Sequence, residues 1–189
     1  AKGLIVFQGL LPFVLEEMRR LYDVRIYIEA DDVSRIAWKL KRDVEHRGYI
    51  KEAVRSEIEK RKPDVEKYIY PQREFADWVV QYSSTADGKI KMEHTMKNSV
   101  AIDGIVTELA TRSTLSIQHH YSDMHVQHVS VEGDIQKDDI ASIAYSLFPN
   151  LHDLLGHEPI FEGGMRGVNQ LLYIAVLNNH YTTRRERVS

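Results

Sequence analysis

Five charged side chains fall close together between positions 39 and 47, at spacings that a helix brings to one side. They are Lys39, Arg42, Asp43, His46 and Arg47. Separations of three, four and seven residues place the first four on one helix face, and Arg47 follows Asp43 by four residues. A carboxylate among fixed cations suits phosphoryl transfer, because cations neutralise charge on the transferring group and the arginine fork holds phosphate oxygens. The spacing therefore predicts a phosphate-handling face on this helix.

The positive charge of the chain is concentrated around the same helix. Residues 35–62 contain ten Lys or Arg and five Asp or Glu, which gives +5, whereas the whole chain carries −3 and the remainder must sum to −8. A solvated basic helix with ion pairs such as Asp43 with Arg47 is the alternative interpretation, and such pairs contribute only about 0.2–0.5 kcal/mol each. Charge alone does not decide between the two.

Local signals predict where this helix begins and ends. A strand over residues 24–28 precedes it, and Asp31 or Asp32 supplies the cap. Gly48 is placed to end it. Apolar residues recur at helical spacing on the opposite face, and we expect them to be buried. They are Val33, Ile36, Ala37, Leu40 and Val44.

The rest of the first 82 residues alternates between strand and helix patterns. We expect strands at 4–7 and 78–80, and helices at 14–22, 51–61 and 65–69, with a break at Pro63. This order predicts a parallel α/β architecture. The fold class predicted for the chain is α/β.

A polar stretch at 83–88 marks the boundary that divides the chain into residues 1–82 and 83–189. Alternating patterns at 89–96, 115–119 and 126–131 then predict a small antiparallel sheet. Helices are expected at 138–147 and 168–176, and the glycines at 163, 164 and 167 are interpreted as a flexible connector. We expect this second part to extend the core or to pair two subunits.

Composition excludes several classes of protein. The chain has 189 residues, 43% of them hydrophobic, and no cysteine, so it has no disulfide or thiolate metal site, in keeping with a reducing cytoplasm. The small net charge predicts no nucleic-acid partner, and the sequence lacks a run of about 20 apolar residues, so we expect no membrane span.

An ordered set of short motifs resembles the phosphoribulokinase and uridine kinase family. The lid helix of that family is matched by Arg42-Asp43-x-x-x-Arg47-Gly48, and further matches follow in the same order over residues 3–82. They are Arg61-Lys62-Pro63-Asp64, Tyr68-Ile69-x-Pro71-Gln72 and Phe75-Ala76-Asp77. Ala37-Trp38-Lys39 and Pro71-Gln72 favour the phosphoribulokinase branch.

The resemblance implies a role for each residue of the lid helix. Arg42 and Arg47 would contact the phosphates of ATP, and Asp43 would be a catalytic acid near the transferred group. Lys39 would meet the sugar phosphate, as a mobile point charge. The implied cofactors are ATP and Mg²⁺.

Two departures from the family pattern bear on metal and nucleotide binding. Gln8 stands where the family has a glutamate that acts with magnesium, and Mg²⁺ prefers anionic oxygen ligands. The sequence also contains no Gly-x-x-x-x-Gly-Lys-Ser/Thr phosphate loop. We therefore expect the chain to be the carboxyl-terminal portion of a longer P-loop kinase and to be inactive alone.

The resemblance implies that the full-length protein phosphorylates D-ribulose 5-phosphate to ribulose 1,5-bisphosphate, a step of carbon fixation. Three alternatives remain open: a uridine or other small-molecule kinase, a non-catalytic relative as Gln8 would suggest, and a binding or assembly module formed by residues 83–189. The expected partners are a small-molecule sugar phosphate and a second copy in a homodimer.

Overall fold

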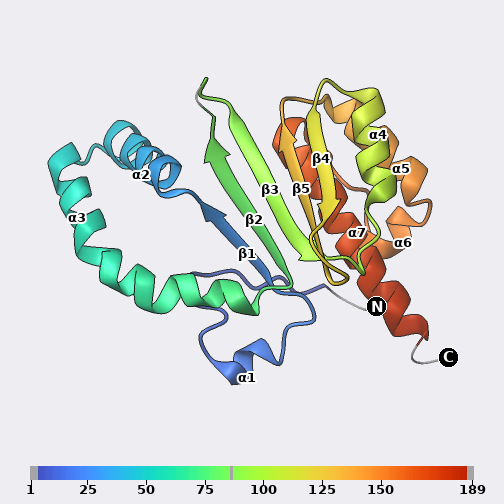
Figure 1. The fold of residues 1–189 in the computed structure, drawn as a ribbon, viewed down its shortest axis with the longest axis horizontal. Coiled ribbons are helices and arrows are strands. Elements are labelled where there is room, and N and C mark those ends of the chain that lie inside the picture. Colours follow the sequence, from blue (N-terminus) through green and yellow to red (C-terminus); the bar gives the residue numbers. More distant parts are fainter. Residues whose placement is uncertain (1–3, 86, 187–189) are drawn as a thin grey trace. The chain divides into compact units, whose positions relative to one another are not determined.

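The computed structural model describes residues 4–85 and 87–186. The chain divides into two compact units, Ala1–Val80 and Gln81–Ser189, which we refer to as unit 1 and unit 2. Figure 1 labels the helices and strands of both. Each unit combines helices with strands, so the predicted α/β class is confirmed.

Unit 1 is built from two strands and a series of helical segments. In chain order they are α1 (Glu16–Arg19), β1 (Ile26–Ala30), α2 (Asp32–Lys41), the π-helix η1 (Arg42–His46), α3 (Lys51–Asp64), the π-helix η2 (Val65–Ile69), the 3-10 helix η3 (Tyr70–Phe75) and β2 (Trp78–Ser84), which continues into unit 2. β1 and β2 are hydrogen-bonded neighbours, and their arrows point the same way in Figure 1. Parallel strands joined by helices are the arrangement predicted for this part.

The helical segment formed by α2 and η1 carries the residues that resemble a lid helix, and we keep that name for it. It has the predicted local signals at both ends. The Asp31 side chain accepts a hydrogen bond from the Ser34 amide at 2.9 Å, which satisfies one of the free donors of the first turn. Gly48 ends the helical segment with φ +72°, a conformation that glycine adopts without strain. Between these ends the α-helix changes to a π-helix at Arg42.

Several local predictions for unit 1 are wrong. Residues 4–7 form no strand, and their side chains are 59–91% exposed. A strand needs a hydrogen-bonded neighbour, and the described strands of unit 1 pair elsewhere. The helix expected at 14–22 has only four residues, and Pro63 lies inside α3 without breaking it.

The core of unit 1 is small. One cluster of buried side chains consists of Phe13, Tyr27 and Val79, and Val54, Trp78 and Val80 are buried as well. The expected burial of the apolar face of α2 is also wrong for Val33, which is 79% exposed, whereas the polar Ser34 and Asp43 are buried. Polar contacts therefore contribute much of the order in this unit.

Unit 2 combines an antiparallel sheet with four helices. After β2 the elements are β3 (Ile90–Lys97), α4 (Asp103–Arg112), β4 (Ser116–Tyr121), β5 (Val126–Glu132), α5 (Lys137–Leu147), α6 (Leu151–Leu155) and α7 (Gly164–Glu186). The strand order is β2-β3-β5-β4, and β5 pairs antiparallel with both neighbours. The predicted antiparallel sheet is confirmed, whereas α4 and α6 were not predicted.

One face of this sheet carries the core of unit 2. Burial alternates along β3 and β5, so that every second side chain is enclosed. Figure 1 shows α4, α5, α6 and α7 together on one side of these strands. Fully buried residues come from both layers, among them Met92, Val131, Ile143 and Leu172.

No helix among the described residues is both long and apolar enough to cross a membrane.

Candidate functional site

The predicted charged face forms a compact cluster around one carboxylate. Asp43 is only 3% exposed, and both of its oxygens are engaged. Lys39 Nζ lies 2.9 Å from Oδ2, while Arg42 Nε and Arg47 Nη1 lie 2.8 and 3.2 Å from Oδ1. Four of the five predicted residues therefore meet at one point, which we call the Asp43 cluster; His46 is exposed.

The main chain around Asp43 is held by the end of the lid helix. Asp43 lies in the π-helix η1, whose wider turn is often found at functional sites. The Tyr49 amide donates to the Asp43 carbonyl at 2.9 Å, and the Gly48 amide donates to the Val44 carbonyl at 3.2 Å. These bonds close the helical segment directly over the cluster.

The ion pair between Arg42 and Asp43, the closest contact of the cluster, shifts the pKa of both side chains. Hydrogen bonds from Arg42 and then Lys39 hold the pKa of the Asp43 carboxyl well below its usual range. The hydrogen bond to Asp43 in turn raises the pKa of Arg42. Asp43 is thus a fixed anion and Arg42 a fixed cation at any physiological pH.

The cations of the cluster remain accessible although the carboxylate does not. The side chains of Lys39, Arg42 and Arg47 are 31%, 52% and 55% exposed. Guanidinium and ammonium groups carry several donors each, and one of these on each side chain is used by Asp43 in the contacts described above. The cluster therefore presents charged donors toward a ligand without exposing its acid.

A second pair of side chains was not identified as important from the sequence. Gln72 is buried; its Oε1 accepts from the Phe13 amide at 2.8 Å, and its Nε2 donates to the carbonyls of Leu10 and Tyr68 at 2.9 and 2.7 Å. Three main-chain contacts from one buried amide fix the path of the amino-terminal segment. The Pro71-Gln72 motif was a signal, although only for family membership.

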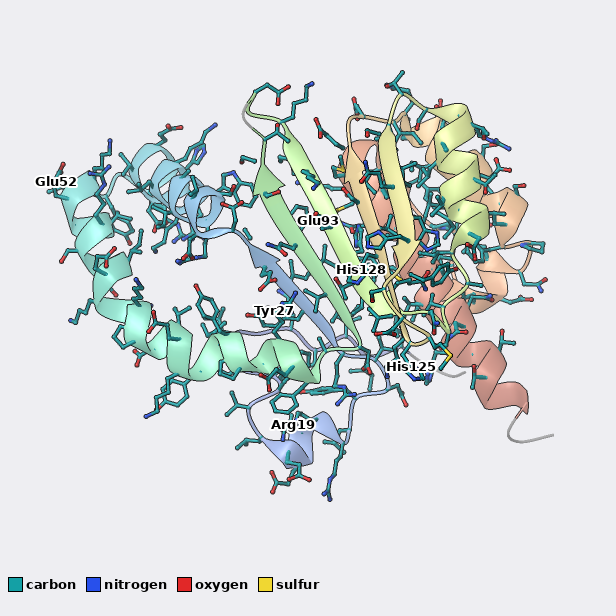
Figure 2. All side chains as sticks on the ribbon, viewed as in Figure 1. Arg19, Tyr27, Glu52, Glu93, His125 and His128 are labelled. Atoms are coloured by element: carbon teal, nitrogen blue, oxygen red, sulfur yellow. The ribbon has the colours of Figure 1, made fainter. Side chains whose placement is uncertain are left out.

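Arg19 completes this attachment from the other side of Phe13. The guanidinium donates to the Phe13 carbonyl at 2.7 Å and lies 3.9 Å above the ring of Phe75. Figure 2 labels Arg19 at the end of α1, below β1 and Tyr27. Phe13 is therefore held at its amide by Gln72 and at its carbonyl by Arg19.

The residues of this chain do not fit a magnesium site. Gln8 is exposed and offers only a neutral amide oxygen, whereas Mg²⁺ prefers carboxylates and phosphates. Among the described residues, no group of three or more His, Cys, Asp or Glu is placed to hold a metal ion. The Asp43 cluster, by contrast, presents three cations around a single carboxylate.

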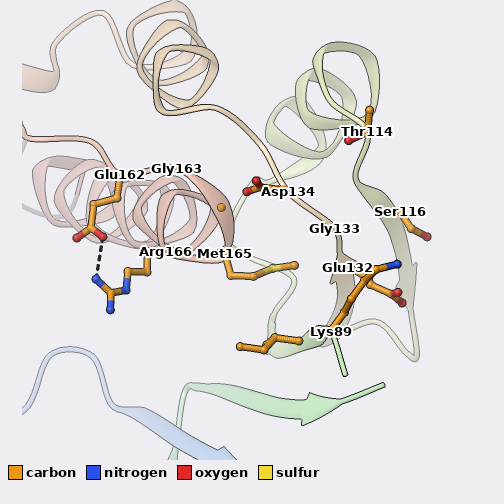
Figure 3. Close-up of a pocket in the computed structure, with 12 residues that line it drawn as sticks. Lys89, Thr114, Ser116, Glu132, Gly133, Asp134, Glu162, Gly163, Met165 and Arg166 are labelled. Carbon is orange, nitrogen blue, oxygen red and sulfur yellow. Dashed lines mark hydrogen bonds and ion pairs between the residues drawn. The ribbon is translucent and has the colours of Figure 1, made fainter. Parts of the chain in front are cut away.

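A cavity in unit 2 contains no residue of the lid helix. It measures about 930 Å³ and is lined by the start of α7, the end of β5 and the β2–β3 turn (Figure 3). Lys89 and Arg166 line it together with Glu132, Asp134 and Glu162, so its charge is mixed. Acidic side chains outnumber basic ones in its lining, whereas the Asp43 cluster carries a net positive charge.

The glycines beside this cavity have a packing role. A Cβ at position 167 would lie 2.2 Å from the Glu162 carbonyl oxygen, and one at 163 would lie 2.9 Å from the Ile135 carbonyl oxygen. Close approach of the main chain requires glycine at both positions. The expected flexible connector is therefore a closely packed helix start.

Comparison with known proteins bears on unit 1 above all. Residues 1–89 match the model of the Phosphoribulokinase / Uridine kinase family. The chain is 39% identical over 82 residues to the chloroplastic phosphoribulokinase of Chlamydomonas reinhardtii and 33% identical over 120 residues to that of Arabidopsis thaliana. It is also 37% identical over 81 residues to uridine-cytidine kinase A of Dictyostelium discoideum.

These matches cover parts of each protein. They include 43%, 60% and 42% of this chain, and 22%, 30% and 16% of the three relatives. The segment matched by the family model, residues 1–89, includes the lid helix and the Asp43 cluster. The matched segment, residues 1–89, is just under half of the chain, and the matches span less than a third of the length of these relatives, so the similarity to the phosphoribulokinase/uridine kinase family is a similarity of this segment.

Proposed function

We propose that the whole protein transfers the terminal phosphoryl group of ATP to D-ribulose 5-phosphate and so forms ribulose 1,5-bisphosphate. The observation that carries this proposal is the Asp43 cluster, in which three accessible cations converge on one buried carboxylate. Phosphoryl transfer depends mainly on positioning and charge neutralisation, and the cluster offers both. The match of residues 1–89 to a family of kinases supports the reaction class.

The individual roles follow the chemistry of each side chain. Arg42 and Arg47 have free guanidinium donors suited to the oxygens of the ATP phosphates. Lys39 carries a compact charge on a flexible stem, which suits the phosphate of the sugar substrate. A lid carrying these groups would also exclude water when it closes over the nucleotide.

ATP and Mg²⁺ are the cofactors we propose for the whole protein. The chain described here contains no Gly-x-x-x-x-Gly-Lys-Ser/Thr loop to cradle the nucleotide phosphates. We therefore expect these 189 residues to show no turnover by themselves. Assay of the purified chain with ATP and ribulose 5-phosphate tests this, and measurable turnover would contradict it.

A nucleoside kinase is the second candidate function. The match to uridine-cytidine kinase A is nearly as strong in identity as the match to phosphoribulokinase. Trp38 and the Pro71-Gln72 pair favour the sugar-phosphate substrate. A panel of ribulose 5-phosphate, uridine and cytidine, assayed with the full-length protein, separates the two candidates by their kcat/KM values.

Substitution of the lid arginines tests the proposed roles. We expect Arg42→Ala and Arg47→Ala each to lower the turnover of the full-length protein by about 100-fold, because each removes a donor to the transferring phosphate. Lys39→Ala should act mainly on the KM for the sugar phosphate.

Arg61→Ala is the matched control, since Arg61 lies on α3 and pairs with Glu57 outside the cluster. It removes the same charge and should leave turnover unchanged. Full activity of both Arg42→Ala and Arg47→Ala would show that the lid assignment is wrong.

A further inference from the structure

We propose that Asp43 is a positioning residue, which holds Lys39, Arg42 and Arg47 together as one cradle for a phosphate group and does not itself contact the ligand. The inference rests on the phosphate-binding role given to these cations under the proposed function. It assigns Asp43 a task different from that of an acid beside the reacting group. The contacts of Asp43, the number of hydrogen-bond donors on the three cations and the net charge of the cluster each support this role.

The geometry leaves the carboxylate little freedom to act elsewhere. Asp43 is buried, Oδ1 accepts from both arginines, and Oδ2 accepts from Lys39. Its main chain is fixed as well, because its carbonyl accepts from the Tyr49 amide. Three of the roughly four acceptor sites of the carboxylate are thus occupied by the cations of the cluster, and its burial restricts access to the remaining one.

The cations, in contrast, can hold Asp43 and a ligand at the same time. Arg42 uses Nε for the carboxylate, which leaves both of its terminal nitrogens, and Arg47 uses Nη1. Lys39 uses one of three ammonium donors. A phosphate that binds on the exposed side therefore needs no displacement of Asp43.

The charge of the cluster matches such a ligand. Three cations and one carboxylate leave a formal charge of +2, which complements a phosphate dianion. Without the carboxylate the three cations would repel one another and spread into solvent. Asp43 thus reduces the net charge while it fixes the direction of the remaining donors.

The protonation behaviour of Asp43 agrees with this role. The hydrogen bonds from Arg42 and Lys39 lower its pKa far below the range in which a general base is effective. A group that stays ionised throughout the working pH range is suited to hold cations in place. It is poorly suited to exchange protons with a substrate hydroxyl.

Binding of inorganic pyrophosphate to the 189-residue chain, without divalent metal, tests the proposal. We expect Asp43→Asn to weaken the affinity by about tenfold, because ordering one long side chain on binding costs about that factor. The matched control is Asp32→Asn, which removes an exposed carboxylate paired with Arg35 on the same helix. Its affinity should remain within about twofold of the wild type, as for other exposed ion pairs.

A direct readout of order accompanies the binding experiment. The Nε–H resonance of Arg42 should be slow to exchange in ¹⁵N NMR spectra of the wild type and exchange rapidly in Asp43→Asn, with circular dichroism unchanged. A variant that had merely lost its fold would lose the dichroism as well. Rapid exchange already in the wild type would overturn the proposal.

The other outcomes also separate the proposal from its rivals. Equal or tighter pyrophosphate binding by Asp43→Asn overturns the positioning role and leaves the phosphate site standing. A loss of affinity that appears only when Mg²⁺ is added makes Asp43 a metal ligand and equally overturns it. Absence of binding by the wild type overturns both the cradle and the phosphate-binding role on which it rests.

Discussion

Units 1 and 2 are held together by different kinds of interaction. Unit 2 encloses a continuous set of apolar side chains between one face of its sheet and its helices, including Met92, Ile143 and Leu172. Unit 1 has a smaller set of buried apolar side chains, among them Phe13, Tyr27 and Val79, and leaves large apolar side chains such as Ile5 and Val33 exposed. The conformation of unit 1 depends more on specific hydrogen bonds and ion pairs made by Gln72, Arg19 and Asp43.

The part of the chain that matches a kinase family is therefore not the part with the larger apolar core. The segment that matches the kinase family is unit 1 and the first residues of unit 2. Hydrophobic burial is non-directional and tolerates exchange among apolar residues, whereas hydrogen bonds need defined partners. Substitutions should therefore act by different rules in the two units.

The largest effect is expected from a truncation in the core of unit 2. Leu172→Ala should lower the free energy of unfolding by about 2–5 kcal/mol, because the side chain is fully enclosed and a cavity remains. Val33→Ala, on the exposed side of α2, should change it by less than about 0.5 kcal/mol. Urea denaturation followed by circular dichroism measures both, and equal effects would remove the contrast between the units.

Loss of the Gln72 contacts should be the most damaging polar change in unit 1. Gln72→Leu leaves the Phe13 amide and the Leu10 carbonyl without their partner, at a cost of about 1–3 kcal/mol. Hydrogen exchange of the amides of residues 10–13 should accelerate at the same time. Gln118→Leu, an exposed position on β4, is the control and should alter neither quantity.

Acid should act on unit 2 through His94. Burial lowers the pKa of this histidine to about 3, whereas an unfolded histidine titrates near 6.5, at roughly its ordinary pKa. The unfolded chain therefore binds the proton first, and the free energy of unfolding decreases as the pH falls from about 6.5 toward 3, by up to about 1.4 kcal/mol per pH unit.

The substitution His94→Met should remove this part of the pH dependence, since methionine fills the core without a titrating group. By pH 5 the protonation of His94 in the unfolded chain lowers the free energy of unfolding of the wild type by about 2 kcal/mol in total, and His94→Met should lack this loss. His125, labelled in Figure 2, is exposed, and His125→Met is the matched control for the substitution. Urea unfolding at a series of pH values gives the comparison; an unchanged slope in His94→Met would refute it.

The smallest effect is expected on the surface of α3. Glu57 pairs with Arg61 one turn later, and both side chains are exposed. Glu57→Gln should change the free energy of unfolding by no more than about 0.5 kcal/mol, since solvent and salt screen such pairs. A larger loss in urea denaturation would mean that surface pairs, as well as buried polar contacts, hold unit 1 together.

Local signals were sufficient to predict the lid helix. The cap at Asp31, the end at Gly48 and the clustering of charge are all properties of neighbouring residues. The strand expected at residues 4–7 is wrong because strand formation depends on a partner that periodicity does not reveal. The helix α4 was missed because only two of its residues, Ile105 and Leu109, are buried, which gives a weak helical pattern. Gly104 near its start weakens the pattern further.

The same limit applies to the candidate site. The grouping of Lys39, Arg42, Asp43 and Arg47 follows from helical spacing, since the contacts join residues at most four apart. The burial of Asp43 and the change to π-helical geometry were not predicted. Gln72 was missed as an anchor because its partners lie 59 and 62 residues away, and no local pattern encodes contacts at that separation.

The Gln72 contacts hold the amino-terminal segment in place independently of the length of the helical arm, by which we mean residues 32–69 from α2 to η2. The arm begins after β1 and ends before Gln72, and α3 lies between these points with Val54 as its buried residue. Each residue added to or removed from α3 would change its length by about 1.5 Å. Insertions and deletions in α3 would therefore leave the attachment at Phe13 intact, so the length of the arm can change without loss of that attachment.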